Sequence, residues 1–249
     1  MNPEQDLSRL RTEYADRTRR LAGSDLYSWF NPANLFTVQQ RQRQVLRMLK
    51  ALGVADLAGL RILEVGCGSG GVLAEYLAFG AAPHNLYGLD LLRGRLAEAK
   101  GRLTGSHFFQ ADGSQMPFAP SSFDLVLQYT AISSVLDPAL RRRMCEEMLR
   151  VLKPGGLIVS YDFWLNPTTR QTRGLRMSEV RASFPGCRIE GRRVTLAPPV
   201  ARRLAPISWG LCLLLESLKI FNTHHLVAVT RTPESIVSFS PLRGDVRAV

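Results

Sequence analysis

Cysteine is scarce in this sequence, with four among 249 residues: Cys67, Cys145, Cys187 and Cys212. No two of them form a CxxC pair, and no group of cysteine and histidine has the spacing of zinc ligands. We therefore predict four separate reduced thiols and no metal site. Isolated cysteines behave as small buried apolar residues, and reduced thiols are typical of the cytosol.

Long apolar runs are also lacking. The longest, Ile207 to Leu215, is soon followed by Glu216 and Lys219, and it is shorter than the roughly 20 residues that cross a bilayer. The first 20 residues contain no apolar segment typical of a secretory signal. We expect a cytoplasmic protein, with a peripheral position at the inner membrane face as a second interpretation.

Acidic residues are fewer than basic ones, 21 against 32, so the formal net charge is +11. Nine arginines but only two glutamates lie between Trp164 and Arg203. This excess favours an anionic partner such as a phosphate-bearing small molecule, an anionic lipid or RNA. A basic surface without any partner explains it equally well. No RRM, KH or helix-turn-helix signature supports specific nucleic-acid binding.

Apolar strands alternate with helices through the middle of the chain. Strands are predicted over residues 61–65, 85–90, 107–112, 123–129 and 157–161, with helices over 72–79, 93–103 and 138–152. Alternation of this kind predicts βαβ units, a parallel sheet and an α/β fold. Two later strands, 188–196 and 225–230, flank a helical insertion over 198–221.

The pattern divides the chain into three parts. Residues 1–53 are predicted to form two helices, with Asn31 capping the second and Pro32 in its first turn. Residues 54–232 form the α/β domain that carries the insertion 198–221. Residues 233–249 form a polar tail that we expect to be mobile.

A glycine-rich loop, EVGCGSGG from Glu64 to Gly71, follows the first predicted strand. Its glycines allow a sharp turn and a close approach of the backbone to a ligand. The GxGxxG spacing also fits a nicotinamide dinucleotide, but Glu64 would repel a pyrophosphate and attract a cationic ligand. Asp90 and Asp112 end the next two strands, so three carboxylates are predicted to face one crevice of the sheet.

Four motifs together resemble the class I S-adenosylmethionine-dependent methyltransferases: ILEVGCGSG at 62–70, LYGLD at 86–90, QADGSQMPFAPSSFDLVL at 110–127 and VLKPGGLIV at 151–159. The similarity is to the subgroup of ubiquinone/menaquinone C-methylases and small-molecule or sugar methyltransferases. It implies a Rossmann-like, seven-stranded, mostly parallel sheet of order 3-2-1-4-5-7-6. Strand 7 is antiparallel, and helices cover both faces.

The resemblance also implies roles for individual residues around S-adenosylmethionine. The amino-acid part of the cofactor would face Glu64 and the loop residues Gly66, Cys67, Gly68 and Gly70. Asp90 would bind the ribose, with Leu91 against the adenine. Asp112 would contact the adenine amine beside Gly113, and Gln128 would lie beside the methionine moiety.

The acceptor is less defined by the sequence. The Asn-Pro-Pro-Tyr signature of amide or adenine N-methylation is missing after the fourth strand, as is a two-cysteine arrangement for pyrimidine C5. Transfer to oxygen of a small or lipid-linked acceptor, for example a sugar, is the leading hypothesis. A hydroxyl acceptor can require a general base, for which Tyr129, Asp162 and the pair His224-His225 are candidates. The alternatives are RNA methylation and a non-catalytic cofactor-binding subunit.

Two segments outside the motifs are candidates for the acceptor side. Leucine and isoleucine recur at helical spacing within 198–221, which predicts a cover for the pocket, a dimer contact or a membrane-surface helix. Tyr27, Trp29 and Phe30 form an aromatic group before the second helix. They are expected to form a lid over the site or to anchor the helix on the core.

Overall fold

A computed structural model describes residues 2–166 and 169–231 of the chain. Its centre is a seven-stranded sheet of order β3-β2-β1-β4-β5-β7-β6. Strands β1 to β5 are parallel, and β7 runs antiparallel to both β5 and β6. The predicted strand order is therefore confirmed. The strands are β1 Ile62–Val65, β2 Leu86–Asp90, β3 His107–Gln110, β4 Phe123–Tyr129, β5 Leu152–Phe163, β6 Arg188–Leu196 and β7 Asn222–Thr230.

Helices cover both faces of the sheet, which explains why most residues of its central strands are apolar. Alternate residues of β1 belong to different cores: Ile62 packs in one cluster of buried side chains and Leu63 in another. Helices α2 and α3 contribute to the first cluster, and α5 contributes to the second. The helices between the strands are α3 Gly71–Ala78, α4 Arg93–Arg102, α5 Pro138–Val151 and α6 Met177–Ser183.

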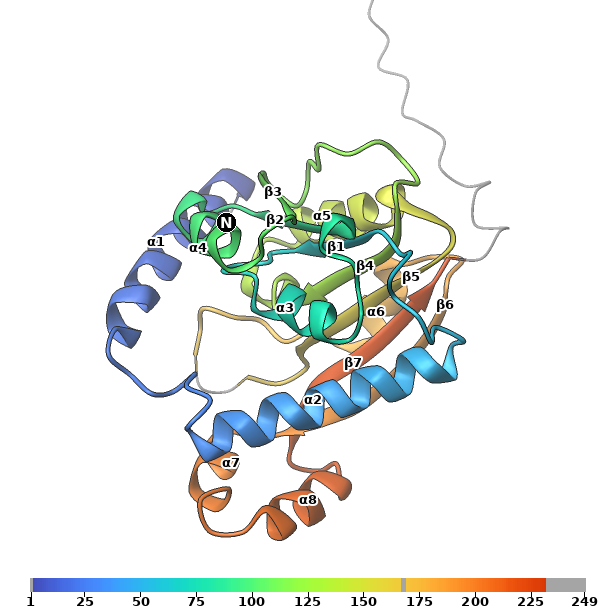
Figure 1. Cartoon of the computed structure of the whole chain (residues 1–249). Helices are drawn as coiled ribbons and strands as arrows, with labels where there is room; N and C mark the ends of the chain where they lie inside the picture. The colour runs from blue at the N-terminus through green and yellow to red at the C-terminus, as the bar shows by residue number, and fades with distance from the viewer. Residues whose placement is uncertain (1, 167–168, 232–249) are drawn as a thin grey trace, which may run out of the picture.

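Two helices precede the sheet, as predicted, and local signals set their ends. Helix α1 (Pro3–Leu21) begins at a capping box in which Asn2 and Gln5 each accept the other's backbone N–H. Helix α2 (Pro32–Ala51) begins at Asn31, whose side chain accepts from two backbone N–H groups. Figure 1 shows α1 standing beside the α3–α4 side of the molecule and α2 crossing below the sheet.

Helix α1 is attached to the loop after β4 by a buried carboxylate. Asp6 is fully buried, and its Oδ2 accepts the backbone N–H groups of Leu136 and Asp137 at 2.6 and 2.7 Å. Arg9 pairs with Asp6 and donates to the carbonyl of Ser134 at 2.5 Å. These bonds hold α1 next to the carboxyl end of β4, where a ligand site is expected in an open α/β sheet.

Three predicted elements differ from the structure. Strand β5 begins at Leu152 rather than 157, and its register against β4 shifts between Leu152 and Leu157, where Gly155 has a φ angle of +74°. The insertion 198–221 is two helices, α7 (Pro198–Leu204) and α8 (Trp209–Ser217), and Pro206 lies between them. The last strand begins at Asn222 rather than 225. The predicted tail 233–249 lies outside the described residues.

Candidate active site

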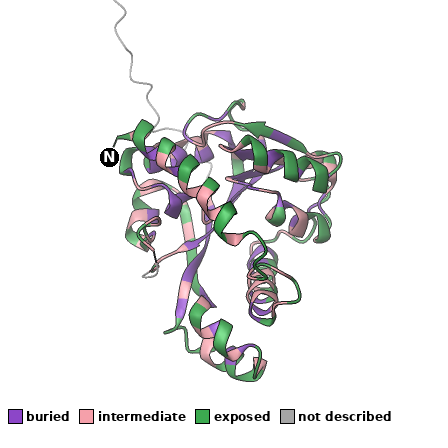
Figure 2. Cartoon of the chain, turned by 90° about the vertical axis from the view of Figure 1, so that its left-hand side faces the viewer, coloured by how far each residue is buried: buried purple, intermediate pink, exposed green. Residues whose placement is uncertain are grey.

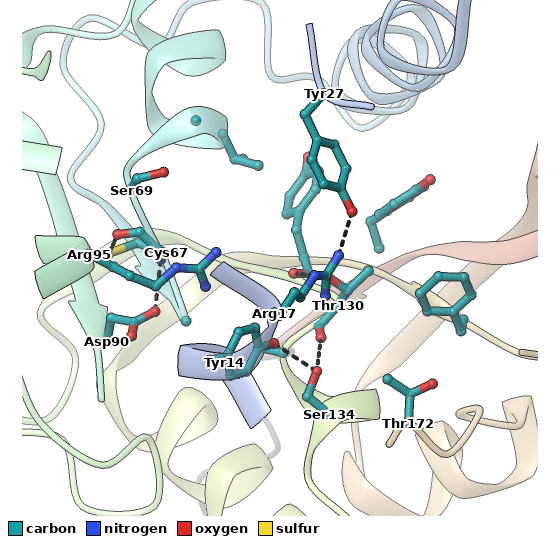
Figure 3. A pocket seen from close by; sticks show the side chains of 18 of the residues that line it. Tyr14, Arg17, Tyr27, Cys67, Ser69, Asp90, Arg95, Thr130, Ser134 and Thr172 are labelled. Atoms are coloured by element: carbon teal, nitrogen blue, oxygen red, sulfur yellow. Dashed lines mark hydrogen bonds between the residues drawn. The ribbon is translucent and has the colours of Figure 1, made fainter. Parts of the chain in front are cut away.

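A cavity of about 1390 Å³ lies at the carboxyl ends of β1, β2 and β4. Helix α1, the turn before α2 and the start of α7 complete its wall. Figure 3 shows Tyr14 and Arg17 of α1 between Asp90 and Arg95 on one side and Thr130 and Ser134 on the other. Because single ligand pockets typically measure about 300–1000 Å³, this volume is enough for two ligands side by side.

The glycine loop between β1 and α3 forms one wall of the cavity. Gly66, Gly68 and Gly70 have φ angles of +76°, +53° and +77°, which favour glycine. A Cβ atom at Gly66 would lie 2.7 Å from Cβ of Ala131, so no larger residue fits there. The N–H groups of Gly66 and Cys67 both donate to the carbonyl of Leu89, which fixes the loop against β2.

Glu64 lies beneath this loop and is 2% exposed. It lines the cavity, and its Oε2 atom has no hydrogen-bond partner among the described residues. Burial, together with the charges of Glu75 and Asp90, raises the pKa of Glu64 well above its ordinary value. A buried carboxylate oxygen without a partner is destabilising, so the site is suited to a ligand that brings a positive charge or N–H donors.

Asp90 ends β2, whereas β3 ends at Gln110, so Asp112 lies two residues beyond the strand that it was predicted to end; both side chains line the cavity. Asp90 accepts the N–H of Gly68 at 2.8 Å and that of Leu92 at 2.9 Å, and thus ties β2 to the glycine loop. Asp112 accepts from the backbone N–H and the hydroxyl of Ser114, both at 2.9 Å. Each carboxylate oxygen keeps a further lone pair for a ligand.

The structure places some of the other residues predicted to bind the cofactor in the cavity wall and others away from it. Gly66, Cys67, Gly68, Leu91 and Gly113 line the same cavity, and Gly70 begins the turn of α3 behind it. Gln128 does not. Its side chain is fully buried, donates to Oγ of Ser160 at 2.5 Å and accepts the N–H groups of Ala131 and Ile132. We therefore assign Gln128 a role in shaping the turn after β4 instead of a ligand contact.

Asp162 is likewise turned away from the cavity. Its carboxylate is 2% exposed and accepts the N–H groups of Ser133 and Phe163 at 3.0 and 2.8 Å. It is absent from the cavity wall within the described part of the chain, and so is His225, which stacks against Trp164. Neither side chain is in reach of a ligand as a general base, because the alternation of side chains along a strand places them on the other face.

Tyr129 and His224 do line the cavity, in a group of side chains that we call the aromatic compartment: Arg41, Tyr129, Tyr161, Phe163 and His224. The ring of His224 stacks on Tyr161 with centroids 4.6 Å apart and tilts against Phe163 at 4.0 Å. The hydroxyl of Tyr161 bonds to that of Thr195 at 2.8 Å. The hydroxyl of Tyr129 bonds to that of Tyr76 at 3.2 Å.

Arg41 of α2 was not singled out from the sequence, yet it lies at the centre of this compartment. Its guanidinium carbon is 5.5 Å from the ring centres of both Tyr129 and Tyr161, and it forms an ion pair with Glu75. The buried Nε atom of Arg41 has no hydrogen-bond partner among the described residues. The spacing of Val38, Arg41 and Val45 on one helix face could have indicated that Arg41 points inward.

The protonation states of this compartment follow from burial. Desolvation raises the pKa of Tyr161 to about 12 and raises that of Tyr129 as well, so both phenols stay protonated. Burial, and next the charge of Arg41, lowers the pKa of His224 to about 3, so this imidazole is neutral at physiological pH. The ion pair of this compartment is formed by Arg41 and Glu75, and the buried carboxyl of Glu64 interacts electrostatically with both.

Two of the three aromatic residues before α2 lie in the wall of the cavity. Tyr27 and Trp29 line it and are 57% and 59% exposed, and the hydroxyl of Tyr27 accepts a hydrogen bond from Arg17 of α1. Phe30 points into solvent. This exposure contradicts the anchoring interpretation, because an anchor would be buried in the core. Arg95, also missed from the sequence, packs over Gly68 and the ring of Tyr14.

Known proteins support the interpretation of this cavity. Residues 63–160 match the family model described as a methyltransferase domain. A demethylmenaquinone methyltransferase from Clavibacter sepedonicus is 36% identical over 134 residues, which are 53% of this chain and 52% of that protein. A sterol 24-C-methyltransferase from Gibberella zeae is 27% identical over 265 residues, 99% of this chain and 64% of that protein. The chain thus spans about half to two thirds of the length of these relatives.

A solved structure shares the fold over most of the chain. It is an S-adenosylmethionine-dependent methyltransferase from Mesorhizobium loti, with a TM-score of 0.55 and 23% identity. The alignment covers 74% of this chain and 96% of that one. At this identity the similarity shows a shared fold, and the chemistry depends on the residues that line the cavity.

Proposed function

Because the chain belongs to the class I S-adenosylmethionine-dependent methyltransferases, we propose that it transfers a methyl group from that cofactor to a small apolar or lipid-linked acceptor. The observation that carries the proposal is Glu64, a cavity-lining residue beside the glycine loop whose buried Oε2 atom has no hydrogen-bond partner among the described residues. When bound, S-adenosylmethionine supplies an electrophilic methyl carbon on a positively charged sulfur. Its ammonium group is the kind of donor that Glu64 lacks.

Residues at the carboxyl ends of β1 and β2 and in the loop after β3 each bind a different part of the cofactor. Glu64 and the loop Gly66–Gly70 hold the amino-acid part. Asp90 accepts the ribose hydroxyls, and Leu91 packs against the adenine. Asp112 accepts from the adenine amine beside Gly113, where a Cβ atom would lie only 3.1 Å from the side chains of Met144 and Val65. Methyl transfer then needs mainly alignment of the acceptor and exclusion of water.

The aromatic compartment holds the acceptor. Its walls, Tyr129, Tyr161, Phe163 and His224, favour a flat apolar molecule over a sugar. The positive charge of Arg41, whose buried Nε atom has no partner among the described residues, favours an acceptor oxygen that carries or develops negative charge, such as a phenolate or enolate. We propose transfer to that oxygen. Tyr129 is protonated and serves as a hydrogen-bond donor instead of a general base. Nδ1 of the neutral His224 lies 3.1 Å from Oγ1 of Thr223, so its Nε2 atom is the one proposed to interact with the acceptor.

Transfer of a labelled methyl group tests this function. We expect the purified chain to move label from S-adenosylmethionine into chloroform-soluble compounds of a cell extract, and the product spectrum shows whether oxygen or carbon was methylated. Asp90→Ala should lower the rate by about ten- to a hundredfold, because the hydrogen bonds from Gly68 and Leu92 and those to the ribose are lost. Label that enters only RNA, or no label despite cofactor binding, would contradict the proposal.

A further inference from the structure

An apolar patch lies on α8 and the turns that flank it. Leu211, Leu214 and Leu218 follow one another at helical spacing on the solvent side, with Ile207 before the helix and Ile220 after it. These five residues, called the apolar patch below, are 40% to 80% exposed. Figure 2 shows α7 and α8 as a unit that projects below the sheet. Large exposed apolar patches mark surfaces that bind a partner or a membrane.

The charges around the patch are of one sign. Arg202, Arg203 and Lys219 are exposed at its rim. The single acid of residues 198–221, Glu216, is turned inward and accepts the backbone N–H of Thr195 at 3.1 Å. The patch therefore combines exposed apolar side chains with cations and no exposed carboxylate of its own segment. This combination matches an anionic lipid surface better than a neutral protein groove.

The mouth of the cavity opens beside this patch. Pro199 and Arg202 of α7 line the cavity and are exposed, and Trp29 lines it from the opposite side. An edge contact between Phe36 of α2 and Trp209, with ring centres 5.6 Å apart, fixes α8 next to this mouth. Figure 1 shows α7 and α8 below the start of α2. A surface bound to the patch would therefore lie next to the entrance.

We propose that this end of the molecule docks on an anionic bilayer. The apolar patch enters the boundary between headgroups and acyl chains, and Arg203 and Lys219 meet the phosphates. The cavity mouth then faces the lipid, so an apolar acceptor passes into the aromatic compartment without crossing water. The role of docking in acceptor entry rests on the proposed function, but membrane binding itself is measured independently of that function.

Sedimentation with lipid vesicles tests the docking. We expect the full chain to bind vesicles of phosphatidylcholine with phosphatidylglycerol at least about tenfold more tightly than phosphatidylcholine alone, because each cation near an anionic surface contributes about fivefold. Raising the salt to about 0.5 M should weaken this binding, since screening shortens the reach of the charges.

Two pairs of matched variants separate the apolar and the charged contributions. Leu214→Ser/Ile220→Ser should weaken vesicle binding at least about tenfold, whereas Leu46→Ser/Leu77→Ser, exposed on other helices, should leave it unchanged. Arg203→Gln/Lys219→Gln should weaken binding to the anionic vesicles only. Arg142→Gln/Arg192→Gln removes the same charge from exposed sites elsewhere and should have a much smaller effect.

Binding of S-adenosylhomocysteine, measured on the same preparations, distinguishes a failure of the docking proposal from a failure of the proposed function. A chain that binds this ligand but no vesicles, or whose patch and control variants bind vesicles equally, would overturn the docking alone. A dimer that the Leu214→Ser/Ile220→Ser change dissociates, without vesicle binding, would assign the patch to a second copy of the chain and overturn it as well. Vesicle binding without ligand binding would support docking and count against the proposed function.

Discussion

Replacing Glu64 by glutamine is expected to stabilise the protein and to weaken its binding of S-adenosylmethionine. The folded protein buries this carboxylate with one oxygen unpartnered. Glutamine keeps the shape but removes the ionisable carboxyl, so we expect a gain of about 1–3 kcal/mol in the free energy of unfolding at pH values above the raised pKa of Glu64. The same change removes the partner of the cofactor's ammonium group and should weaken binding by about ten- to a hundredfold.

The pH dependence of this gain follows from the raised pKa of Glu64. Between the ordinary pKa of a glutamate and the raised value, the folded state binds more protons than the unfolded state, so wild-type stability falls as pH rises. The charges of Glu75 and Asp90 raise the pKa of Glu64 further, and the charge of Arg41 lowers it. The advantage of Glu64→Gln should therefore be small near pH 4 and largest above the raised pKa.

Urea unfolding at several pH values, with calorimetric titration of the cofactor, measures both effects. Glu98→Gln is the matched control, because Glu98 is exposed on α4. We expect it to change neither stability nor affinity appreciably. A Glu64→Gln protein that is less stable than wild type, or that binds the cofactor as tightly, would show that Glu64 has a structural role only.

Replacing Arg41 by methionine is expected to cause the largest loss of stability. The side chains of Arg41 and Glu75 are 15% and 12% exposed, so the change leaves a largely buried carboxylate without its partner. Removing one member of such a pair costs about 3–5 kcal/mol. Burial already raises the pKa of Glu75 against the opposing charge of Arg41. The loss should therefore be greatest at neutral pH and shrink in acid, where Glu75 is neutralised.

A double-mutant cycle tests the pairing of Arg41 with Glu75. Arg41→Met/Glu75→Leu should recover most of the stability lost in the single variant, because no buried charge then remains alone. Arg47→Met, on the exposed side of the same helix, is the control for the change of residue type. Single-variant losses that simply add in the double variant would contradict a coupled ion pair.

The sequence is sufficient to predict the sheet and the cofactor side of the cavity because both depend on local patterns. Asp90 ends β2 and Asp112 lies two residues after β3, and parallel strands bring their carboxyl ends to one edge. Gln128 and Asp162 also lie near strand ends, but their side chains face away from the cavity. Their position in the strand was predictable, while their direction depends on the pairing of β4 with β5.

The acceptor side was harder to predict because it is assembled from distant segments. Arg41 and Glu75 lie 34 residues apart in the chain, and no motif connects them. His224 was expected to precede a strand, but β7 begins two residues before it and stacks its ring on Tyr161. The single insertion helix expected over 198–221 is interrupted around Pro206, a residue that cannot donate a helical N–H.

Calorimetric titration with S-adenosylhomocysteine, S-adenosylmethionine and NADH tests the central claim most directly. The account predicts that the wild-type chain binds both sulfur ligands and not NADH. It also predicts that Asp90→Ala, checked to be folded, weakens binding by about 1–3 kcal/mol, as for lost buried hydrogen bonds. A folded wild-type chain that binds neither sulfur ligand, or that prefers NADH, would contradict the assignment of this cavity to S-adenosylmethionine.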